Sequence, residues 1–211
     1  MATRYLASIL VGAALTVLSS ISWAAGGTVT DPTGVAPDRY TYYPGTEALS
    51  EDEIRVVACG TGSMANVAAL MIPYQYLDKL FLSHLHTDHM GDIDALWAGG
   101  WTAGRPNALQ VWGPSGREES MGTKYAMENF LRHVNWDRVT RNFKITPVPG
   151  NIEVHEFDYR GINQVVYDES GVVVRSWPAI HAGDGPVSYA LEYAGMKVVF
   201  GGDTVPNKWF L

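Results

Sequence analysis

The 211-residue chain has one cysteine and a shortage of positive charge, and each shortage excludes a class of function. A single cysteine cannot form an internal disulfide framework or a cysteine-rich zinc finger. With 15 Lys and Arg against 22 Asp and Glu, the net charge of −7 argues against non-specific binding of nucleic-acid phosphates as the main task. The sequence also has no internal repeats, coiled-coil heptads or low-complexity tracts, so a single domain is expected.

The N-terminus has the layout of a secretory signal peptide. Arg4 precedes an apolar run over residues 6–21, and Ser22-Trp23-Ala24 provides small residues at the two positions that a signal peptidase reads. The run has 16 residues, whereas a membrane-spanning helix needs about 20. We therefore predict that residues 1–24 are removed, that residues 25–211 are periplasmic or secreted, and that no membrane contact remains after cleavage. The oligomeric state is left open.

The rest of the chain alternates short β-branched runs with helical patterns. Apolar residues at helical spacing predict a helix over residues 117–134, and residues 92–97 read as the first turns of another. Gly60-Thr61-Gly62 closes the first strand candidate with a tight turn. This order of elements predicts one mixed α/β domain. Strands are expected at residues 54–59, 79–83, 109–112, 152–157, 172–177, 187–193 and 196–200.

Three of the six histidines fall within six positions, in the segment His84-Leu85-His86-Thr87-Asp88-His89. Residues two apart at the end of a strand face the same side, so His84 and His86 should point together. Imidazole nitrogens and carboxylate oxygens are ligands that borderline divalent metals accept. Four such groups exceed what one tetrahedral ion takes from a single loop, so the pattern predicts two ions side by side. A surface histidine cluster is the alternative, and this spacing arises rarely by chance.

Two later residues are further candidate ligands. His181 follows the strand expected at 172–177. Asp203 follows the strand expected at 196–200, after two glycines that let the backbone turn and the carboxylate project. A lone histidine after a strand is more often structural. Because both residues stand at strand ends and follow the histidine-rich motif, we expect them to complete its ligand set.

On these residues the sequence resembles the metallo-β-lactamase-fold metallohydrolases. The family pattern is His-x-His-x-Asp-His, then a lone His, a strand-terminal Asp and a final His. The VWGPSG segment at 111–116 and the GGDT segment at 201–204 resemble the ribonuclease Z and arylsulfatase-like branch, which hydrolyses phosphodiesters or sulfate esters. The resemblance implies a four-layer αββα sandwich, with metals bound on loops at one edge of two packed sheets.

The resemblance also implies which residues hold two divalent ions, expected to be zinc with manganese or iron as alternatives. His84, His86 and His181 would hold one ion, Asp88 and His89 the second, and Asp203 would bridge both. Two ions close together lower the pKa of a shared water and polarise the ester that it attacks. Asp88 is the candidate catalytic residue, orienting that water as the nucleophile.

Two features depart from the family pattern. No histidine follows Asp203, so the last family ligand is missing. Only 21 residues separate Gly62 from His84, which leaves no room for the strand and Asp-x-Gly turn expected there. We therefore expect a domain that is truncated at its C-terminus and lacks N-terminal strands.

Three functions follow from these observations. The leading expectation is an exported dinuclear metal hydrolase of a small ester (phosphodiester, sulfate ester or lactone), without a nucleic-acid partner. The first alternative is a ribonuclease Z-like tRNA 3′-processing endonuclease. The export signal, the acid excess and the lack of a Gly/Pro-rich arm between Gly116 and His181 argue against it. The second alternative is a truncated, catalytically inactive metal-binding product.

Two other groups of residues have a plainer interpretation. Trp97, Trp101 and Trp112 are expected to pack in the core, with a pocket beside the metals as the alternative. A mildly basic stretch is typical of a solvated helix face, with an RNA contact as the alternative. Its cations are Arg132, Arg138, Arg141 and Lys144.

Overall fold

The computed structural model describes Val67 and residues 72–209, all of which belong to one compact unit, Gly45–Leu211. Three predictions lie outside these residues: the signal peptide at 1–24, the strand at 54–59 and the glycine turn at 60–62. Among the described residues, no helix is both long and apolar enough to cross a membrane.

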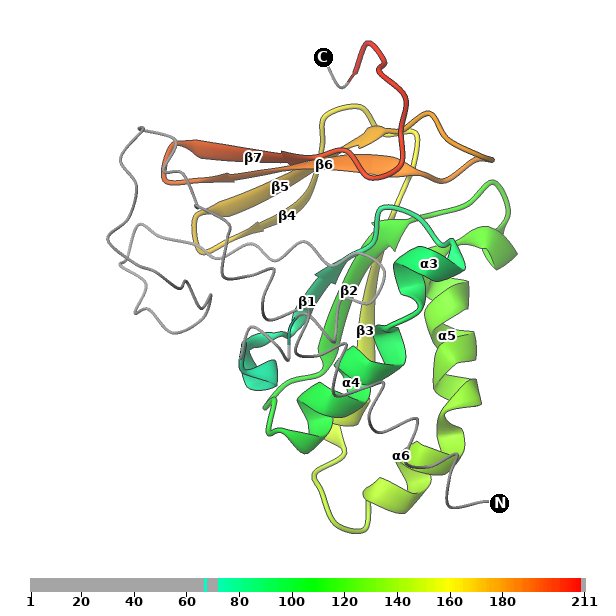
Figure 1. The fold of residues 1–211 in the computed structure, drawn as a ribbon, viewed down its shortest axis with the longest axis vertical. Helices are drawn as coiled ribbons and strands as arrows, with labels where there is room; N and C mark the ends of the chain where they lie inside the picture. Colours follow the sequence, from blue (N-terminus) through cyan, green and yellow to red (C-terminus); the bar gives the residue numbers. More distant parts are fainter. Residues whose placement is uncertain (1–66, 68–71, 210–211) are drawn as a thin grey trace, which may run out of the picture. The chain divides into compact units, whose positions relative to one another are not determined.

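The first sheet is parallel and has the strand order β1-β2-β3 (Figure 1). Its register pairs Leu80 with Val111 and Val111 with Val154. Parallel neighbours need a crossover connection, and helices supply both crossovers of this sheet. The strands are β1 (Lys79–Phe81), β2 (Leu109–Pro114) and β3 (Ile152–Phe157).

Helices cover one face of this sheet. Helix α4 (Ile93–Thr102) links β1 to β2, and α5 (Thr123–His133) with α6 (Asn135–Arg141) links β2 to β3. Side chains alternate between the faces of a strand, and Leu109 and Val111 of β2 enter the helix-side core. Short elements complete this half: η1 (Tyr74–Tyr76), α3 (Thr87–Met90), η2 (Glu119–Met121) and η3 (Val148–Gly150).

A buried arginine links several backbone segments of the helix-side core by hydrogen bonds. Arg105 is 1% exposed, and its guanidinium donates hydrogen bonds to five backbone carbonyls of α4, η3 and the neighbouring loops. Burial lowers the pKa of Arg105 below its ordinary value, and the charge of Asp78 opposes this shift. Gly100 leaves the space that the guanidinium occupies, because a Cβ there would overlap it. The accepting carbonyls are those of Leu77, Leu96, Trp97, Asn107 and Pro149.

The second sheet is antiparallel and has the strand order β4-β5-β6-β7 (Figure 1). Two of its hairpins have two-residue loops with positive φ at both positions: Ser170 (φ 53°) with Gly171 (φ 78°), and Ala194 (φ 47°) with Gly195 (φ 79°). That backbone conformation matches the right-handed twist of paired strands. The strands are β4 (Gln164–Glu169), β5 (Val172–Pro178), β6 (Val187–Tyr193) and β7 (Met196–Phe200).

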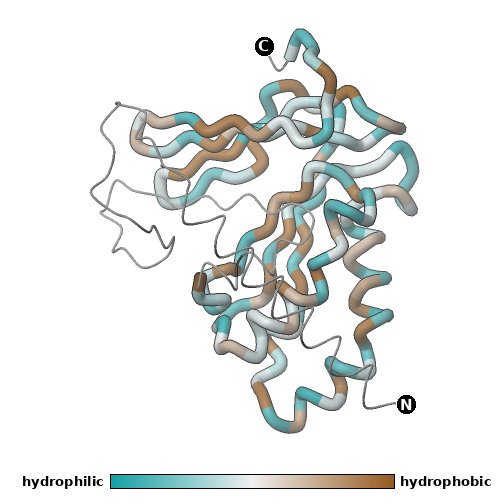
Figure 2. The backbone as a smooth tube through the Cα atoms, viewed as in Figure 1, coloured by the Kyte–Doolittle hydropathy of each residue, from teal (hydrophilic) through white to brown (hydrophobic). Residues whose placement is uncertain are grey.

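Aromatic side chains join the two sheets. Phe81 of β1 stacks on Trp112 of β2 at 4.9 Å between ring centroids and meets Tyr189 of β6 edge-on at 5.9 Å. Trp112 also packs with Phe157 and Val174. Figure 2 shows hydrophobic stretches in the strands of both sheets, as expected for strands that bury one or both faces. The described residues thus form three layers: helices, a parallel sheet and an antiparallel sheet.

This arrangement confirms the predicted mixed α/β fold and six of the seven predicted strands. Among residues 72–209 every helix lies between Tyr74 and Gly150, and β7 is exposed along its whole length. The fourth layer of the predicted sandwich, over the outer face of the second sheet, stays a prediction, as does the truncation of the domain.

Some elements differ from the prediction. The helix predicted from residue 117 begins at Thr123, because η2 and the extended Gly122 precede it. Strand β4 was not predicted, and its pairing with β5 is irregular between Val165 and Tyr167, which breaks simple alternation. Helix α6 was also not predicted, because it buries no residue and therefore has no apolar stripe to detect.

Candidate metal centre

The site begins where β1 ends, and both sheets hold that end in place. Leu82 donates a backbone hydrogen bond to Trp112 of β2 at 2.9 Å. The second sheet contributes two more bonds: the Tyr189 hydroxyl donates to the Leu82 carbonyl at 2.7 Å, and Val187 N–H donates to the Ser83 carbonyl at 2.9 Å. The residues immediately before His84 are thus fixed between the sheets.

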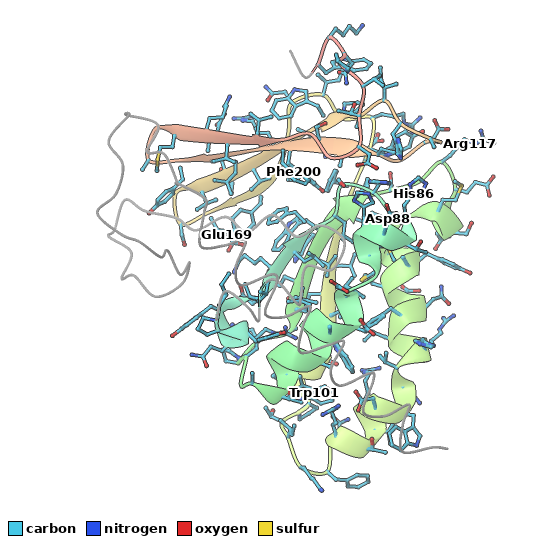
Figure 3. All side chains as sticks on the ribbon, in the orientation of Figure 1. His86, Asp88, Trp101, Arg117, Glu169 and Phe200 are labelled. Atoms are coloured by element: carbon cyan, nitrogen blue, oxygen red, sulfur yellow. The ribbon has the colours of Figure 1, made fainter. Side chains whose placement is uncertain are left out.

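The histidine-rich segment then turns into a short helix. His86 is the N-terminal flanking residue of α3, and Asp88 and His89 lie within that helix. Figure 3 shows His86 and Asp88 beyond the end of the first sheet, at the opposite end of the layer from Trp101. His84 is buried, whereas His86 and Asp88 are exposed. The segment therefore places one ligand in the protein interior and the others at its surface.

The two later ligands lie on neighbouring loops of the second sheet. The loop after β5 carries His181 and is closed by a bond from Ala179 N–H to the Pro186 carbonyl at 2.9 Å. Thr204, next to Asp203, accepts a hydrogen bond from Ile180 N–H at 3.0 Å on its Oγ1. This hydrogen bond therefore joins the loop that carries His181 to the loop that carries Asp203.

Gly202 is needed for the approach of Asp203 to the first sheet. Its φ is 61°, and a Cβ at this position would lie 2.9 Å from the Cβ of Ser83. Positive φ and close packing both favour glycine. This confirms the prediction that a glycine lets the backbone turn ahead of the carboxylate.

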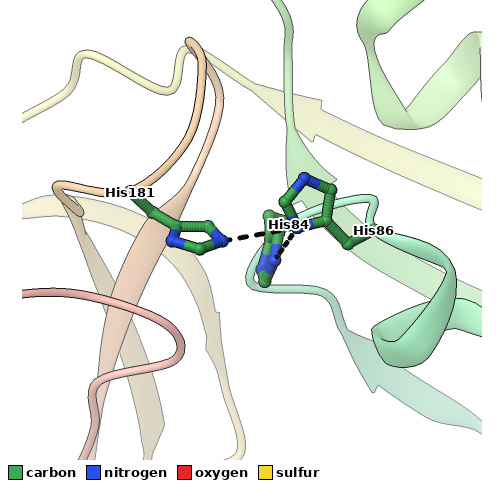
Figure 4. A group of neighbouring side chains, drawn as sticks. All are labelled: His84, His86 and His181. Carbon is green, nitrogen blue, oxygen red and sulfur yellow. Dashed lines mark hydrogen bonds between the residues drawn. The ribbon is translucent and has the colours of Figure 1, made fainter.

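Three histidines from both sheets converge on one point (Figure 4). His84 Nε2 lies 3.0 Å from His86 Nδ1, and His181 Nε2 lies 3.3 Å from the same His86 nitrogen. In a tetrahedral zinc site with bonds of 2.0–2.1 Å, ligand atoms are about 3.4 Å apart. The donor atoms thus have the spacing that a single divalent ion requires, and they are the three residues expected to share the first ion.

A second group shares His84 and adds His89 and Asp203. The Oδ2 atom of Asp203 lies 3.2 Å from His89 Nε2, 3.7 Å from His181 Nε2 and 4.0 Å from His84 Nε2. This one oxygen therefore faces members of both groups, as a bridging ligand must. Asp88 lies outside both groups, although its Oδ2 is 3.5 Å from His89 Nε2.

The electrostatics of the site favour the neutral, metal-binding form of the His84 imidazole. Burial, followed by the neighbouring His89 and His86, lowers the pKa of His84 from 6.5 to about 4, while Asp203 opposes the shift. Metal ligation requires an unprotonated imidazole nitrogen, so His84 is in the binding form at neutral pH. Ser83 Oγ lies 3.2 Å from His84 Nδ1 and can hold the tautomer that leaves Nε2 facing the other ligands.

Several residues that support the site were not predicted from the sequence. Ser83 was adjacent to the motif, but nothing in its local pattern distinguished it. Tyr189 and Thr204 act through packing between distant segments, which a single sequence does not reveal. Arg117, which follows β2, lies 3.9 Å from Asp184 in the loop that carries His181. The VWGPSG segment that ends just before Arg117 was the available signal for that contact.

The sequence model of the family described as "Beta-lactamase superfamily domain" matches residues 56–209, which is most of the chain. The chain belongs to this family. The predicted family is thereby confirmed, and with it the hydrolase class of the domain.

The curated relatives include ribonucleases of the predicted branch. Ribonuclease Z of Mycobacterium marinum (strain ATCC BAA-535 / M) is 30% identical over 174 residues, covering 81% of this chain and 60% of its own length. Ribonuclease Z of Mycobacterium avium (strain 104) is 32% identical over 175 residues, covering 81% and 59%. The metallo-beta-lactamase fold protein YhfI from Bacillus subtilis aligns with 71% of this chain and 50% of its own, at 16% identity and a TM-score of 0.47. The chain spans about 60% of the length of these two ribonucleases.

These relatives correct one prediction. The expectation of a small-ester substrate and no nucleic-acid partner is wrong, because the curated relatives are ribonucleases, which act on RNA. The expectation rested on the export signal, on the lack of a Gly/Pro-rich arm and on a net charge of −7. Net charge averages over the whole surface, whereas an RNA contact depends on where the cations lie and on any ions held at the site.

Proposed function

We propose that the chain is the hydrolase domain of a metal-dependent RNA phosphodiesterase, and that it cleaves the 3′ trailer from precursor tRNA as a ribonuclease Z-like enzyme. The observation that supports this proposal best is the convergence of four imidazoles and Asp203 in a chain about 30% identical to ribonucleases Z. The donor set fits two divalent ions, and zinc suits its nitrogen and oxygen ligands, with manganese or iron as alternatives.

The roles of the residues follow from their positions. His84, His86 and His181 would hold one ion, and His89 would hold the other beside Asp203, which would bridge the two. When bound, such ions polarise the phosphoryl oxygen and lower the pKa of the attacking water.

Asp88 is proposed to orient the attacking water and to accept its proton. Its carboxylate is exposed and lies 3.5 Å from His89 Nε2, outside both convergent groups, so it stands beside the donor set rather than within it. A positioned general base contributes about 10²- to 10⁴-fold to the rate. This role belongs to Asp88 rather than to Asp203, whose Oδ2 is directed at the histidines.

The test combines metal analysis with RNA cleavage. The purified chain is expected to contain zinc by elemental analysis and to shorten a precursor tRNA transcript that carries a 3′ trailer. Asp88→Ala should retain the metal and lose at least about 100-fold in rate. His133→Ala, an exposed histidine on α5, is the matched control and should behave as wild type. Bound metal without cleavage of precursor tRNA or of bis(p-nitrophenyl) phosphate would instead support the inactive metal-binding alternative.

Export, predicted from the sequence of residues 1–24, is a competing proposal, because an exported chain would not meet precursor tRNA in the cytoplasm. A C-terminally tagged chain should appear in the extracytoplasmic fraction of its host, shortened by about the length of the signal peptide. Leu10→Arg interrupts the apolar run and should retain the full-length chain in the cytoplasm. A wild-type chain that stays uncleaved in the cytoplasm would exclude export.

A further inference from the structure

Helix α6 has an exposed aromatic surface far from the metal centre. Trp136 is 78% exposed and Phe143 is 85% exposed, and they are the two most exposed of the large hydrophobic residues described. Val139, between them, is 51% exposed. Trp136 and Val139 are three residues apart and share one face of α6, and Phe143 lies in the turn that follows the last helical residue, Arg141, so we group these three exposed side chains as an apolar ridge.

Cations are frequent in the sequence around this ridge. The segment from residue 129 to 144 contains four of the chain's 15 Lys and Arg residues and only one of its 22 Asp and Glu residues. We call the ridge and its cations the α6 patch. Its members are Trp136, Val139, Phe143, Arg132, Arg138, Arg141 and Lys144.

Most of the positive charge in the patch is not neutralised by the protein. Arg141 donates to its neighbour Asp137 at 2.6 Å, so that pair is compensated. Arg138 reaches only the neutral amide oxygen of Asn151, at 3.3 Å, and Arg132 only that of Asn129, at 3.4 Å. Neither these two arginines nor Lys144 has an ion-pair partner among residues 72–209.

A pocket adjoins the patch where α5 meets α6. It has a volume of about 440 Å³, and two of the patch arginines lie on its wall. Its lining combines two guanidinium groups with one carboxylate and one amide, so the pocket offers more donors than acceptors. The lining residues are Glu128, Leu131, Arg132, Asn135 and Arg138.

We propose that the α6 patch binds the RNA substrate at a second site, away from the metal centre. The proposal rests on the proposed RNA phosphodiesterase function. Exposed aromatic rings stack on unpaired bases, and the cations beside them contact phosphates. The local excess of cations in an acidic chain is complementary to a polyanion, whereas a second copy of this chain would bring its own net charge of −7.

The position of the patch suits a substrate larger than the site. Helix α5 begins beside the end of the first sheet at which β2 ends, and it runs along the strands to α6 at the opposite end (Figure 1). With 11 residues, α5 is about 16 Å long. A folded RNA such as a tRNA precursor can therefore contact the α6 patch while its cleavage point lies at the metal centre.

Binding to fluorescein-labelled mature tRNA, which has no trailer to cleave, tests this proposal on the intact zinc-loaded chain. In fluorescence anisotropy, Trp136→Ala with Phe143→Ala should raise Kd about tenfold or more. The triple change Arg132→Gln, Arg138→Gln and Lys144→Gln should reduce the slope of log Kd against log salt by about two. Neither change should alter hydrolysis of bis(p-nitrophenyl) phosphate by more than about twofold, because the metal centre is distant.

The matched control is Tyr76→Ala with Arg160→Gln, since Tyr76 is 72% exposed and the Arg160 side chain is 74% exposed outside the patch. An unchanged Kd and salt slope in the patch variants would overturn the proposal. The proposal would also be overturned if light scattering showed that the wild-type chain is a dimer and that the patch variants are monomers with unchanged affinity for tRNA. A wild-type chain that binds tRNA through the patch but hydrolyses no phosphodiester would support the patch and reject the proposed function.

Discussion

The two sheets contribute to the metal centre in different ways. The parallel sheet supplies the contiguous His84–His89 segment, and its central strand β2 is almost fully buried beneath the helices. The antiparallel sheet supplies His181 and Asp203 on separate loops, and its outermost described strand, β7, is exposed throughout. One sheet therefore holds a compact motif on a rigid base, and the other positions single ligands from loops.

Because the two sheets supply different ligands, the geometry of the metal centre depends on how the sheets are joined. Ring nitrogens 95 residues apart in sequence, in His86 and His181, lie 3.3 Å apart in space. The junction consists of the aromatic cluster around Phe81 and Trp112 and the two hydrogen bonds from β6 to the end of β1. Changes at this junction should affect metal binding, whereas changes in the helix-side core should affect folding alone.

The largest effect is expected from removing a shared ligand. Asp203→Ala should release both ions and reduce RNA cleavage about 1,000-fold or more, because Asp203 is the ligand proposed to bridge them and metal stabilisation of the transition state is worth several kcal/mol. His86→Ala and His181→Ala belong to different sheets but to one group, so each should release one ion and leave the other. Elemental analysis of the purified variants measures these stoichiometries. If His86→Ala and His181→Ala retained different amounts of metal, the proposal that the two sheets share one ion through these residues would be wrong.

The next effect separates folding from metal binding. Arg105→Met should lower the free energy of unfolding by about 3 kcal/mol or more, because it leaves five buried carbonyls without their donor. Zinc affinity of the fraction that folds should stay at the wild-type value, since Arg105 lies in the helix-side core. Urea denaturation and zinc titration measure the two quantities. Arg105→Lys keeps the charge and should recover part of the stability.

A smaller, matched comparison concerns two buried hydroxyls. Tyr189→Phe and Thr123→Val each remove a hydroxyl that donates to a backbone carbonyl, at 2.7 and 2.8 Å. Each should cost about 1–3 kcal/mol of stability. Only Tyr189→Phe should also weaken zinc binding, by about 10- to 100-fold, because the Tyr189 hydroxyl fixes the backbone before His84. Equal zinc affinities in the two variants would show that the β6 contact does not position the ligand.

The last effect is absent at neutral pH and concerns the pH dependence of the metal-free protein. The pKa of His84 falls from 6.5 to about 4 on folding, so the unfolded chain binds more protons between these values. The contribution of His84 to stability should be full above about pH 6.5 and should decline as the pH falls towards 4. Denaturation in the presence of a chelator at several pH values measures this change. His84→Gln should flatten that part of the profile, and His133→Ala should leave it intact.

Local pattern was enough to predict most of the fold. Strands such as β3 and β6 were predicted with their observed bounds, because each is a short β-branched or aromatic run between turn residues. The exposed helix α6 and the irregular strand β4 were missed because neither has a clean periodicity. The sequence reveals which side chains are buried only where the regular spacing of a helix or strand places them on one face.

The sequence by itself determined the family and the identity of the six candidate ligands, because the histidine motif is contiguous and the later ligands follow strands. Tertiary structure decided which ligands meet. It placed Asp203 beside His89, 114 residues earlier, and kept Asp88 outside both groups. It also selected Tyr189 and Arg105 as supports. These outcomes depend on packing between distant segments, which no local pattern encodes.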